Sequence, residues 1–286
     1  MSINKKINNI FVVGLGLIGS SLSRALKESN QFNRIIGYDT SREVISIAIK
    51  EKYIDESVEK ISDGITISDL IIFCVPVSEI KKCLEQSKNF FNTEKIFTDT
   101  LSSKGKILEY FLDNEFTDIS NFVYSHPMAG TENYGIKNSK KDLFKGSTSI
   151  VCSMKNSSVE SLEVIKNMWI LVGCKIFKIE IDLHDEILSA VSHVPHFISF
   201  VLSKKINESD FDDKYPWIRD RGSLADMLRI SKSDPVAWAN IFLSNKKYIS
   251  KFINEYIDDL KLLDSNINSD DVNNLISFLN KSNSNN

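Results

Sequence analysis

Four histidines, His126, His184, His193 and His196, are the only imidazole groups in this chain of 286 residues. Three of them gather in "HDEILSAVSHVPH", whereas His126 stands alone in "YSHPMAGTENYG". An imidazole can accept a proton near neutral pH, so a histidine next to a hydride acceptor can serve the oxidation of an alcohol to a carbonyl. A single histidine is more often structural. The clustering, and the expected place of His126 directly after a strand, "NFVYS", favour a catalytic site at the carboxyl edge of a sheet.

A glycine turn near the N-terminus predicts the hydride acceptor. "VVGLGLIGSSL" places Gly14, Gly16 and Gly19 between a strand and a helix, which is the context of a dinucleotide fingerprint. Gly14 would permit the tight turn, Gly16 would let the backbone approach a pyrophosphate, and Gly19 would let helix and strand pack closely. The predicted cofactor-binding segment consists of Gly14, Leu15, Gly16, Leu17, Ile18 and Gly19.

The end of the second strand predicts which nicotinamide cofactor is used. Asp39 ends "RIIGYD", where a carboxylate accepts hydrogen bonds from the ribose hydroxyls and repels a 2′-phosphate. We therefore expect NAD rather than NADP. Arg42 is the competing signal, because a guanidinium at this place can reach a 2′-phosphate.

The elements that must position these groups follow a βαβ pattern. Short apolar strands are predicted at 9–13, 34–39, 69–76 and 95–100, with amphipathic helices between them. Continuous β-branched strands are typical of a parallel sheet that is covered on both faces. Further strands at 148–152 and 174–181 extend this part, so we expect a Rossmann-type doubly wound α/β domain over residues 1–180.

The remaining residues, 181–286, predict an all-helical domain for substrate binding and dimerisation, with a polar tail, "NKSNSNN", that we expect to be disordered. Its segments repeat apolar residues at three- and four-residue spacing, most clearly from 235 to 263. A helical domain of about a hundred residues has difficulty burying such faces alone, which favours a homodimer.

Composition excludes several classes of partner. The net charge of −3 favours neither nucleic acid nor an anionic membrane surface, and the longest apolar run, "LIIFCVPV", has the length of a strand. The N-terminus lacks the features of a signal peptide. Four cysteines without metal-ligand spacing predict no metal site and a reducing, cytoplasmic location.

Several motifs, in this order, resemble the prephenate dehydrogenase family, which includes arogenate and cyclohexadienyl dehydrogenases. They are "GLGLIGSSL", "CVPV", "TDTLSSKGKI", "SHPMAGTE", "HD..L..VSHVPH" and "D..RISKSDP..W". The resemblance covers roughly residues 8 to 250. It implies an NAD(P)-dependent oxidative decarboxylation of prephenate to 4-hydroxyphenylpyruvate in tyrosine biosynthesis.

The resemblance also implies roles for individual residues on the substrate side. His126 matches the catalytic histidine that contacts the ring hydroxyl, and Ser102 matches a serine beside it. Arg229 matches the arginine that binds a substrate carboxylate, and a guanidinium suits that role because it pairs with a carboxylate in a bidentate fork. Asp226 stands three residues earlier, on the same face of a predicted helix, and could orient Arg229.

Four further positions carry over from the family in the same way. His193 and His196 match paired histidines that contact the substrate and close the cleft, and Pro76 and Val77 would lie along the cofactor.

The chain departs from the family pattern beside two of these positions. Leu101 stands where a glycine is usual and Ser103 where a valine is usual, so the placement of Ser102 is open. Ser223 and Leu228 replace a glycine and a threonine before the arginine, which can alter the substrate side of the pocket.

Three alternatives remain open on this basis. One alternative substrate is arogenate, which has an amine in place of the side-chain keto group, used alone or together with prephenate. His196 favours prephenate or dual use, because arogenate-specific relatives tend to lose that histidine. A non-catalytic NAD-binding sensor would need the glycine turn but not Ser102, His126 and Arg229 together. A β-hydroxyacid dehydrogenase would use a lysine of the helical domain and fits the histidine motifs poorly.

Overall fold

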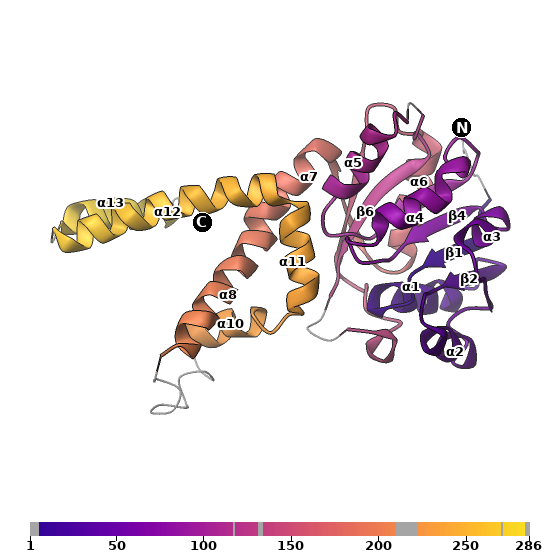
Figure 1. The fold of residues 1–286 in the computed structure, drawn as a ribbon, viewed down its shortest axis with the longest axis horizontal. Helices are drawn as coiled ribbons and strands as arrows, with labels where there is room; N and C mark the ends of the chain where they lie inside the picture. The colour runs from indigo at the N-terminus through magenta and orange to yellow at the C-terminus, as the bar shows by residue number, and fades with distance from the viewer. Residues whose placement is uncertain (1–5, 117, 131–133, 210–221, 270, 284–286) are drawn as a thin grey trace.

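An eight-stranded sheet forms the N-terminal part, in the order β3-β2-β1-β4-β5-β6-β7-β8 (Figure 1). The computed structural model describes residues 6–116, 118–130, 134–209, 222–269 and 271–283. Neighbouring strands are parallel except for β6 and β7, which are antiparallel. The strands are β1 (Asn9–Val13), β2 (Arg34–Tyr38), β3 (Glu56–Ser57), β4 (Leu70–Phe73), β5 (Ile96–Asp99), β6 (Phe122–Met128), β7 (Thr148–Ser153) and β8 (Lys175–Glu180).

Both faces of the central strands β1, β4 and β5 are buried, which explains the continuous apolar runs of these strands. In β1, Phe11 and Val13 pack into one hydrophobic cluster, while Ile10 and Val12 pack into the other on the opposite face. The helices that cover the faces are α1 (Leu17–Glu28), α2 (Arg42–Lys50), α3 (Ile61–Thr66), α4 (Ile80–Ser87), α5 (Gly105–Asp113) and α6 (Val159–Leu171). The predicted doubly wound α/β class is confirmed, and the strand order reverses between β1 and β4, where such folds bind their ligands.

The chain becomes helical after β8, as predicted. The elements are α7 (Ile181–Leu188), a π-helical turn η3 (Ser189–His193), α8 (Val194–Asn207), α10 (Gly222–Ile230), α11 (Pro235–Ser244), α12 (Lys246–Asn268) and α13 (Val272–Asn283). The π turn directly precedes α8, whose second residue, Pro195, cannot donate a helical hydrogen bond. Because β8 ends at Glu180 and α7 begins at Ile181, we propose the domain boundary between these two residues.

The structure differs from the sequence-based expectation in three places. Strand β6 continues to Met128 because it pairs with β7, so His126 lies inside the strand and not after it. The helical run expected from 235 to 263 breaks at Asn245 between α11 and α12. Helix α13 extends to Asn283, over part of the tail expected to be disordered, and residues 284–286 lie outside the described residues.

The helical part is open in shape, with much apolar surface exposed. Helices α12 and α13 pack on each other and form an arm that extends away from α8, α11 and the sheet (Figure 1). The continuous helical stretch from Ile181 to Asn207 is long and apolar enough to cross a membrane by length and composition, although only 28% of its most apolar window is buried. Its polar residues His184, Asp185 and His193 are buried against neighbouring elements, as in a core helix of a globular protein.

Candidate active site

The glycine turn between β1 and α1 has the geometry of a phosphate cradle. Gly14 has φ of +94°, and a Cβ there would lie 2.5 Å from the Cys74 carbonyl oxygen. A Cβ at Gly19 would lie 1.9 Å from the Gly14 oxygen, so both positions require glycine. A Cβ at Gly16 would meet nothing within 4 Å. This open space lies at the amino end of α1, whose first turn carries no acidic residue and no side-chain cap, so its N–H groups can receive an anion.

Asp39 links this turn to the next helix. Its Oδ2 accepts a hydrogen bond from Leu15 N at 2.8 Å and its Oδ1 accepts one from Ser41 N at 2.9 Å. Each carboxylate oxygen keeps a second lone pair with which it can accept from a ligand hydroxyl. A hollow of about 510 Å³ lies beside Asp39, with Thr40 and the exposed Arg42 in its lining. The sequence-predicted ribose-binding residues are therefore grouped around a hollow of ligand size.

The other turn residues and the loop after β4 contribute unequally to this surface. Leu15 is fully buried, whereas Leu17 and Ile18 are partly exposed on α1. After β4, Pro76 is exposed and Val77 packs into the hydrophobic core.

His126 is held by the pairing of its strand β6 with β7 and by His184 on α7. Its strand pairs with β5 only through Phe122 and Val123, after which β6 turns to pair with β7. Its exposed fraction is 9%, and its Nδ1 lies 3.2 Å from Nε2 of His184 on α7. Burial holds the pKa of His126 well below its ordinary value, and the neighbouring His184 and Lys104 add to this effect. His126 is therefore a neutral imidazole at physiological pH.

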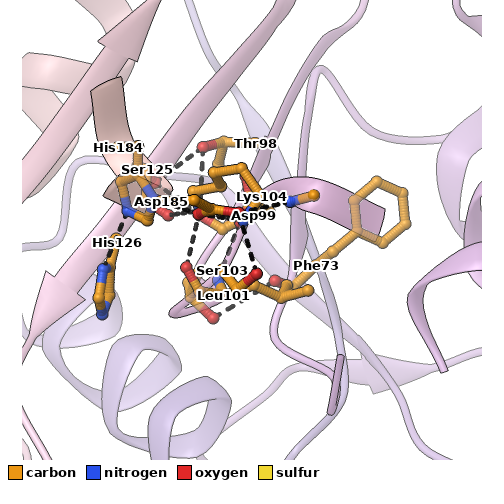
Figure 2. Close-up of polar contacts among 12 residues, drawn as sticks. Phe73, Thr98, Asp99, Leu101, Ser103, Lys104, Ser125, His126, His184 and Asp185 are labelled. Carbon is orange, nitrogen blue, oxygen red and sulfur yellow. Dashed lines mark hydrogen bonds and ion pairs between the residues drawn. The ribbon is translucent and has the colours of Figure 1, made fainter. Parts of the chain in front are cut away.

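A buried lysine organises the backbone around His126. Lys104 is fully buried, pairs with the Asp99 carboxylate, and donates to the carbonyl oxygens of Leu101 at 2.7 Å and Ser125 at 2.8 Å. Figure 2 shows the ammonium group at the centre of these oxygens. Lys104 therefore links Ser125, the residue before His126, to the loop that follows β5. Leu101, an expected departure from the family pattern, thus adds its side chain to the core and its carbonyl to this cluster.

Asp185 fixes the start of the helical part to the same loop. Its carboxylate accepts hydrogen bonds from Lys104 N at 2.8 Å, Gly105 N at 2.9 Å, Ser103 Oγ at 3.2 Å and His184 Nδ1 at 2.7 Å. Two of these donors belong to the amino end of α5, where a carboxylate is also favoured by the helix dipole. Asp99, Lys104, His184 and Asp185 were not predicted as site residues, although all four stand within the quoted motifs.

The remaining two histidines face the other helices. Nδ1 of His193 lies 3.0 Å from the Asn245 amide nitrogen, and its Nε2 is buried without a hydrogen-bond partner in the described part of the chain. His196 stacks on Trp238 with 3.6 Å between ring centroids, and its Nδ1 lies 2.9 Å from the Ser192 carbonyl oxygen. Burial lowers the pKa of His193 to about 4 and lowers that of His196.

The structure brings Arg229 towards His196, whereas the expected pairing of Asp226 with Arg229 is not made among the described residues. The positive charge of Arg229, on α10, reaches His196 and contributes to lowering its pKa, after burial. Arg229 and Asp226 are both exposed, and no ion pair joins them among the described residues. Ser102 is half-buried in the loop before α5, and within the described ranges no hydrogen bond joins it to His126.

Comparisons with known proteins identify the family. The model of the prephenate dehydrogenase nucleotide-binding domain matches residues 22–178, and that of the prephenate dehydrogenase dimerization domain matches residues 180–281. The prephenate dehydrogenase of Bacillus subtilis is 28% identical over 278 residues, which cover 96% of this chain and 74% of that protein. The cyclohexadienyl dehydrogenase of Zymomonas mobilis is 30% identical over 264 residues, covering 92% and 89%.

A solved structure extends the agreement to three dimensions. Prephenate dehydrogenase from Aquifex aeolicus, in complex with hydroxyphenyl propionate and NAD+, superimposes with a TM-score of 0.84 at 30% identity, covering 99% of this chain and 98% of that one. The two family models match most of the chain, and the glycine turn from Gly14 to Gly19 directly precedes the first match. The chain belongs to the prephenate dehydrogenase family.

Proposed function

We propose that this protein catalyses the NAD-dependent oxidative decarboxylation of prephenate to 4-hydroxyphenylpyruvate. The observation that carries the proposal is a neutral, buried His126 at the carboxyl side of the sheet, on the same edge as a glycine turn suited to a dinucleotide. The names of the related proteins from B. subtilis and Z. mobilis support the same reaction class.

Prephenate sets three requirements for the site. It carries a hydroxyl at ring carbon C4, and a carboxylate and a pyruvyl group at C1. During the reaction a hydride leaves C4, a base takes the hydroxyl proton, and the C1 carboxylate leaves as CO₂ while the ring becomes a phenol. The enzyme must therefore align C4, supply one base and bind a substrate with two carboxylates.

We assign the base to His126, because a neutral imidazole can accept the C4 hydroxyl proton. Ser102 is proposed to contact the same hydroxyl from the loop after β5. Arg229 is proposed to bind a substrate carboxylate from α10, helped by His193 and His196. The position of His193 supports this, since its buried ring lies against the backbone of Ser102, which is proposed to contact the substrate hydroxyl.

The residues around the glycine turn fit NAD. The open space at Gly16 and the uncapped N–H groups of α1 suit a pyrophosphate, and Asp39 suits the hydroxyls of a ribose. When bound, NAD supplies the acceptor for the hydride. The contribution of this chain is to orient the ring of the substrate and to hold the proton that leaves its hydroxyl.

A second candidate substrate is arogenate, used alone or beside prephenate. The relative from Z. mobilis is named a cyclohexadienyl dehydrogenase and is 30% identical, so the fold and the motifs are compatible with this alternative. Arogenate carries an amine where prephenate has its side-chain keto group, and we expect His196 and Arg229 to discriminate between the two substrates.

Assays of both substrates with both cofactors test the proposal. We expect the highest kcat/KM for prephenate with NAD, followed by formation of 4-hydroxyphenylpyruvate. Turnover of arogenate alone would assign the enzyme to the second candidate. An absence of turnover with either substrate, in a protein that still binds NAD, would favour the sensor alternative.

We further propose that the protein acts as a homodimer in the cytoplasm. The family model that matches residues 180–281 is a dimerization domain, and the arm of α12 and α13 exposes apolar side chains that a second copy can cover. These include Leu260, Ile267, Ile276 and Leu279. The cysteines Cys74, Cys83, Cys152 and Cys174 are all free, which suits a reducing compartment.

A further inference from the structure

We propose that His184 and Asp185 are positioning residues that set the tautomer of His126, so that its Nε2 is free to accept a proton. The proposal deepens the function proposed above, because it concerns the residue assigned as base. Three side chains are joined in a chain by two consecutive contacts. Asp185 Oδ1 lies 2.7 Å from His184 Nδ1, and His184 Nε2 lies 3.2 Å from His126 Nδ1.

The carboxylate at the end of this chain is ionised. Burial alone would raise the pKa of Asp185, but hydrogen bonds from His184, Lys104 N and Gly105 N outweigh burial and lower it. A carboxylate that accepts several N–H donors has no proton to give. The ring nitrogen that faces it must therefore carry one, which places a proton on His184 Nδ1.

His184 has no second proton. Burial lowers its pKa, as does Lys104, and Asp185 opposes this only in part, so the ring is neutral at physiological pH. A neutral imidazole with its proton on Nδ1 has a lone pair on Nε2. His184 therefore presents an acceptor to His126 across the boundary between the sheet and the helical part.

The lone pair on Nε2 of His184 determines which tautomer His126 adopts. Nδ1 of His126 must donate, so the single proton of this neutral ring resides on Nδ1 and its Nε2 is a lone pair. Figure 2 shows that this second nitrogen points away from His184 and from the Lys104 cluster. The opposite tautomer would set two lone pairs against each other at 3.2 Å and would place a proton on the nitrogen that has to receive one.

The arrangement also stabilises the product of proton transfer. When Nε2 of His126 takes the hydroxyl proton, the ring becomes a cation that still donates from Nδ1 to His184. The Asp185 carboxylate lies at the far end of the chain and favours this charge, while the Lys104 ammonium beside it is already paired with Asp99. No proton needs to move to His184 or Asp185. In the same way, the aspartate of a catalytic triad orients its histidine without becoming protonated.

Nitrogen NMR of the ¹⁵N-histidine-labelled protein tests the tautomers directly, because the chain has only four histidines. We expect protons on Nδ1 of His126, His184 and His196, and on Nε2 of His193, whose Nδ1 accepts from the Asn245 amide. Single His→Gln variants assign the signals. A wild-type His126 with its proton on Nε2 would overturn the proposal, whatever its kinetics.

Two variants of His184 separate the ring-to-ring contact from the contact with Asp185. In His184→Asn the short amide can still donate to Asp185 but cannot reach His126, whereas in His184→Gln the longer amide can place an acceptor near His126 Nδ1. We expect kcat to fall about 10- to 100-fold in the Asn variant, with recovery of most of it in the Gln variant. The proton of His126 should move to Nε2 in the Asn variant alone.

Ser62→Ala is the matched control. It also removes a hydroxyl donor to a carboxylate, that of Asp63 at 3.3 Å, but it lies on α3 outside the site and should leave kcat and the tautomers unchanged. A kcat within about threefold of wild type in His184→Asn would overturn the proposal. If instead the wild type failed to turn over prephenate or arogenate while the tautomer pattern held, the proposed function would be wrong and the positioning chain would stand.

Discussion

His126 Nδ1 and His184 Nε2, 3.2 Å apart, join a strand of the sheet to the first helix of the helical part. The contact lies beside the buried Lys104–Asp99 pair and the Asp185 carboxylate, so three segments meet at one point. His126, the proposed base, is therefore held by both parts of the chain. A change in how the helical part sits on the sheet alters the orientation of His126 directly.

The cofactor preference follows from Asp39. A carboxylate that bonds to Leu15 N and Ser41 N is fixed in place and repels the 2′-phosphate of NADP. We expect a higher kcat/KM with NAD than with NADP, and a smaller difference in Asp39→Asn. Equal or better turnover with NADP in the wild type would mean that Arg42 outweighs the carboxylate.

Arg229→Ala should raise KM for prephenate while NAD affinity stays nearly intact. The lost guanidinium–carboxylate contact should lower kcat/KM about 30- to 1,000-fold. Steady-state kinetics and NAD titration of the same preparation measure both quantities. Lys204→Ala, which removes an exposed positive charge on α8, is the control and should behave as wild type. Unchanged substrate kinetics in Arg229→Ala would remove this residue from the site.

The glycine turn and the change from mixed to all-helical structure could be predicted from the sequence, because both depend on local patterns. The turn needs glycine where φ is positive or where a Cβ meets backbone, and strand–turn–helix context is visible within some thirty residues. The role of His126 as base was expected from a motif.

The partners of His126 could not be predicted in this way. Lys104 and Asp185 are 81 residues apart, and nothing in their spacing indicates that a backbone N–H of one bonds to the carboxylate of the other. The extension of β6 to Met128 likewise depends on pairing with β7, which is a tertiary contact. Both features arise from packing between segments that are distant in sequence.

The unfolding free energy should decrease when the pH falls below about 6.5, the ordinary pKa of histidine. Burial lowers the pKa of all four histidines in the folded state, to about 4 for His193, so the unfolded chain binds more protons in this window. Each buried histidine contributes up to about 1.4 kcal/mol per pH unit until its folded pKa is reached. Above 6.5 these groups are neutral in both states and have no effect.

Urea unfolding at several pH values between about 7.5 and 4.5 measures this dependence. His193→Gln should reduce the slope, because it removes one titrating group. A stability that stays constant or rises on acidification through this range would contradict the neutral state of the buried histidines.

The arm of α12 and α13 should hold two copies together. Leu260 is 61% exposed on α12, and a charge there would face the partner, so Leu260→Asp should shift the protein from dimer towards monomer. Leu112→Asp is the control, since Leu112 is 79% exposed on α5 of the sheet domain and should tolerate the charge. Light scattering at micromolar concentration measures both. A monomeric wild type would contradict the predicted dimer.

The pH–rate profile of His126→Asn beside wild type tests the central claim most directly. Asparagine keeps a polar side chain but removes the titratable nitrogen, and general-base catalysis contributes about 10²–10⁴-fold, so kcat should fall by that order. NAD affinity, measured separately, should persist because the glycine turn and Asp39 are untouched. The wild-type kcat/KM should fall in acid as a single group is protonated. The midpoint of this fall should lie below the ordinary histidine pKa, because burial lowers the pKa of His126. The fall in acid should be absent in the variant. A variant that keeps most of its kcat, or that keeps the acid limb unchanged, would contradict the assignment of His126 as the base.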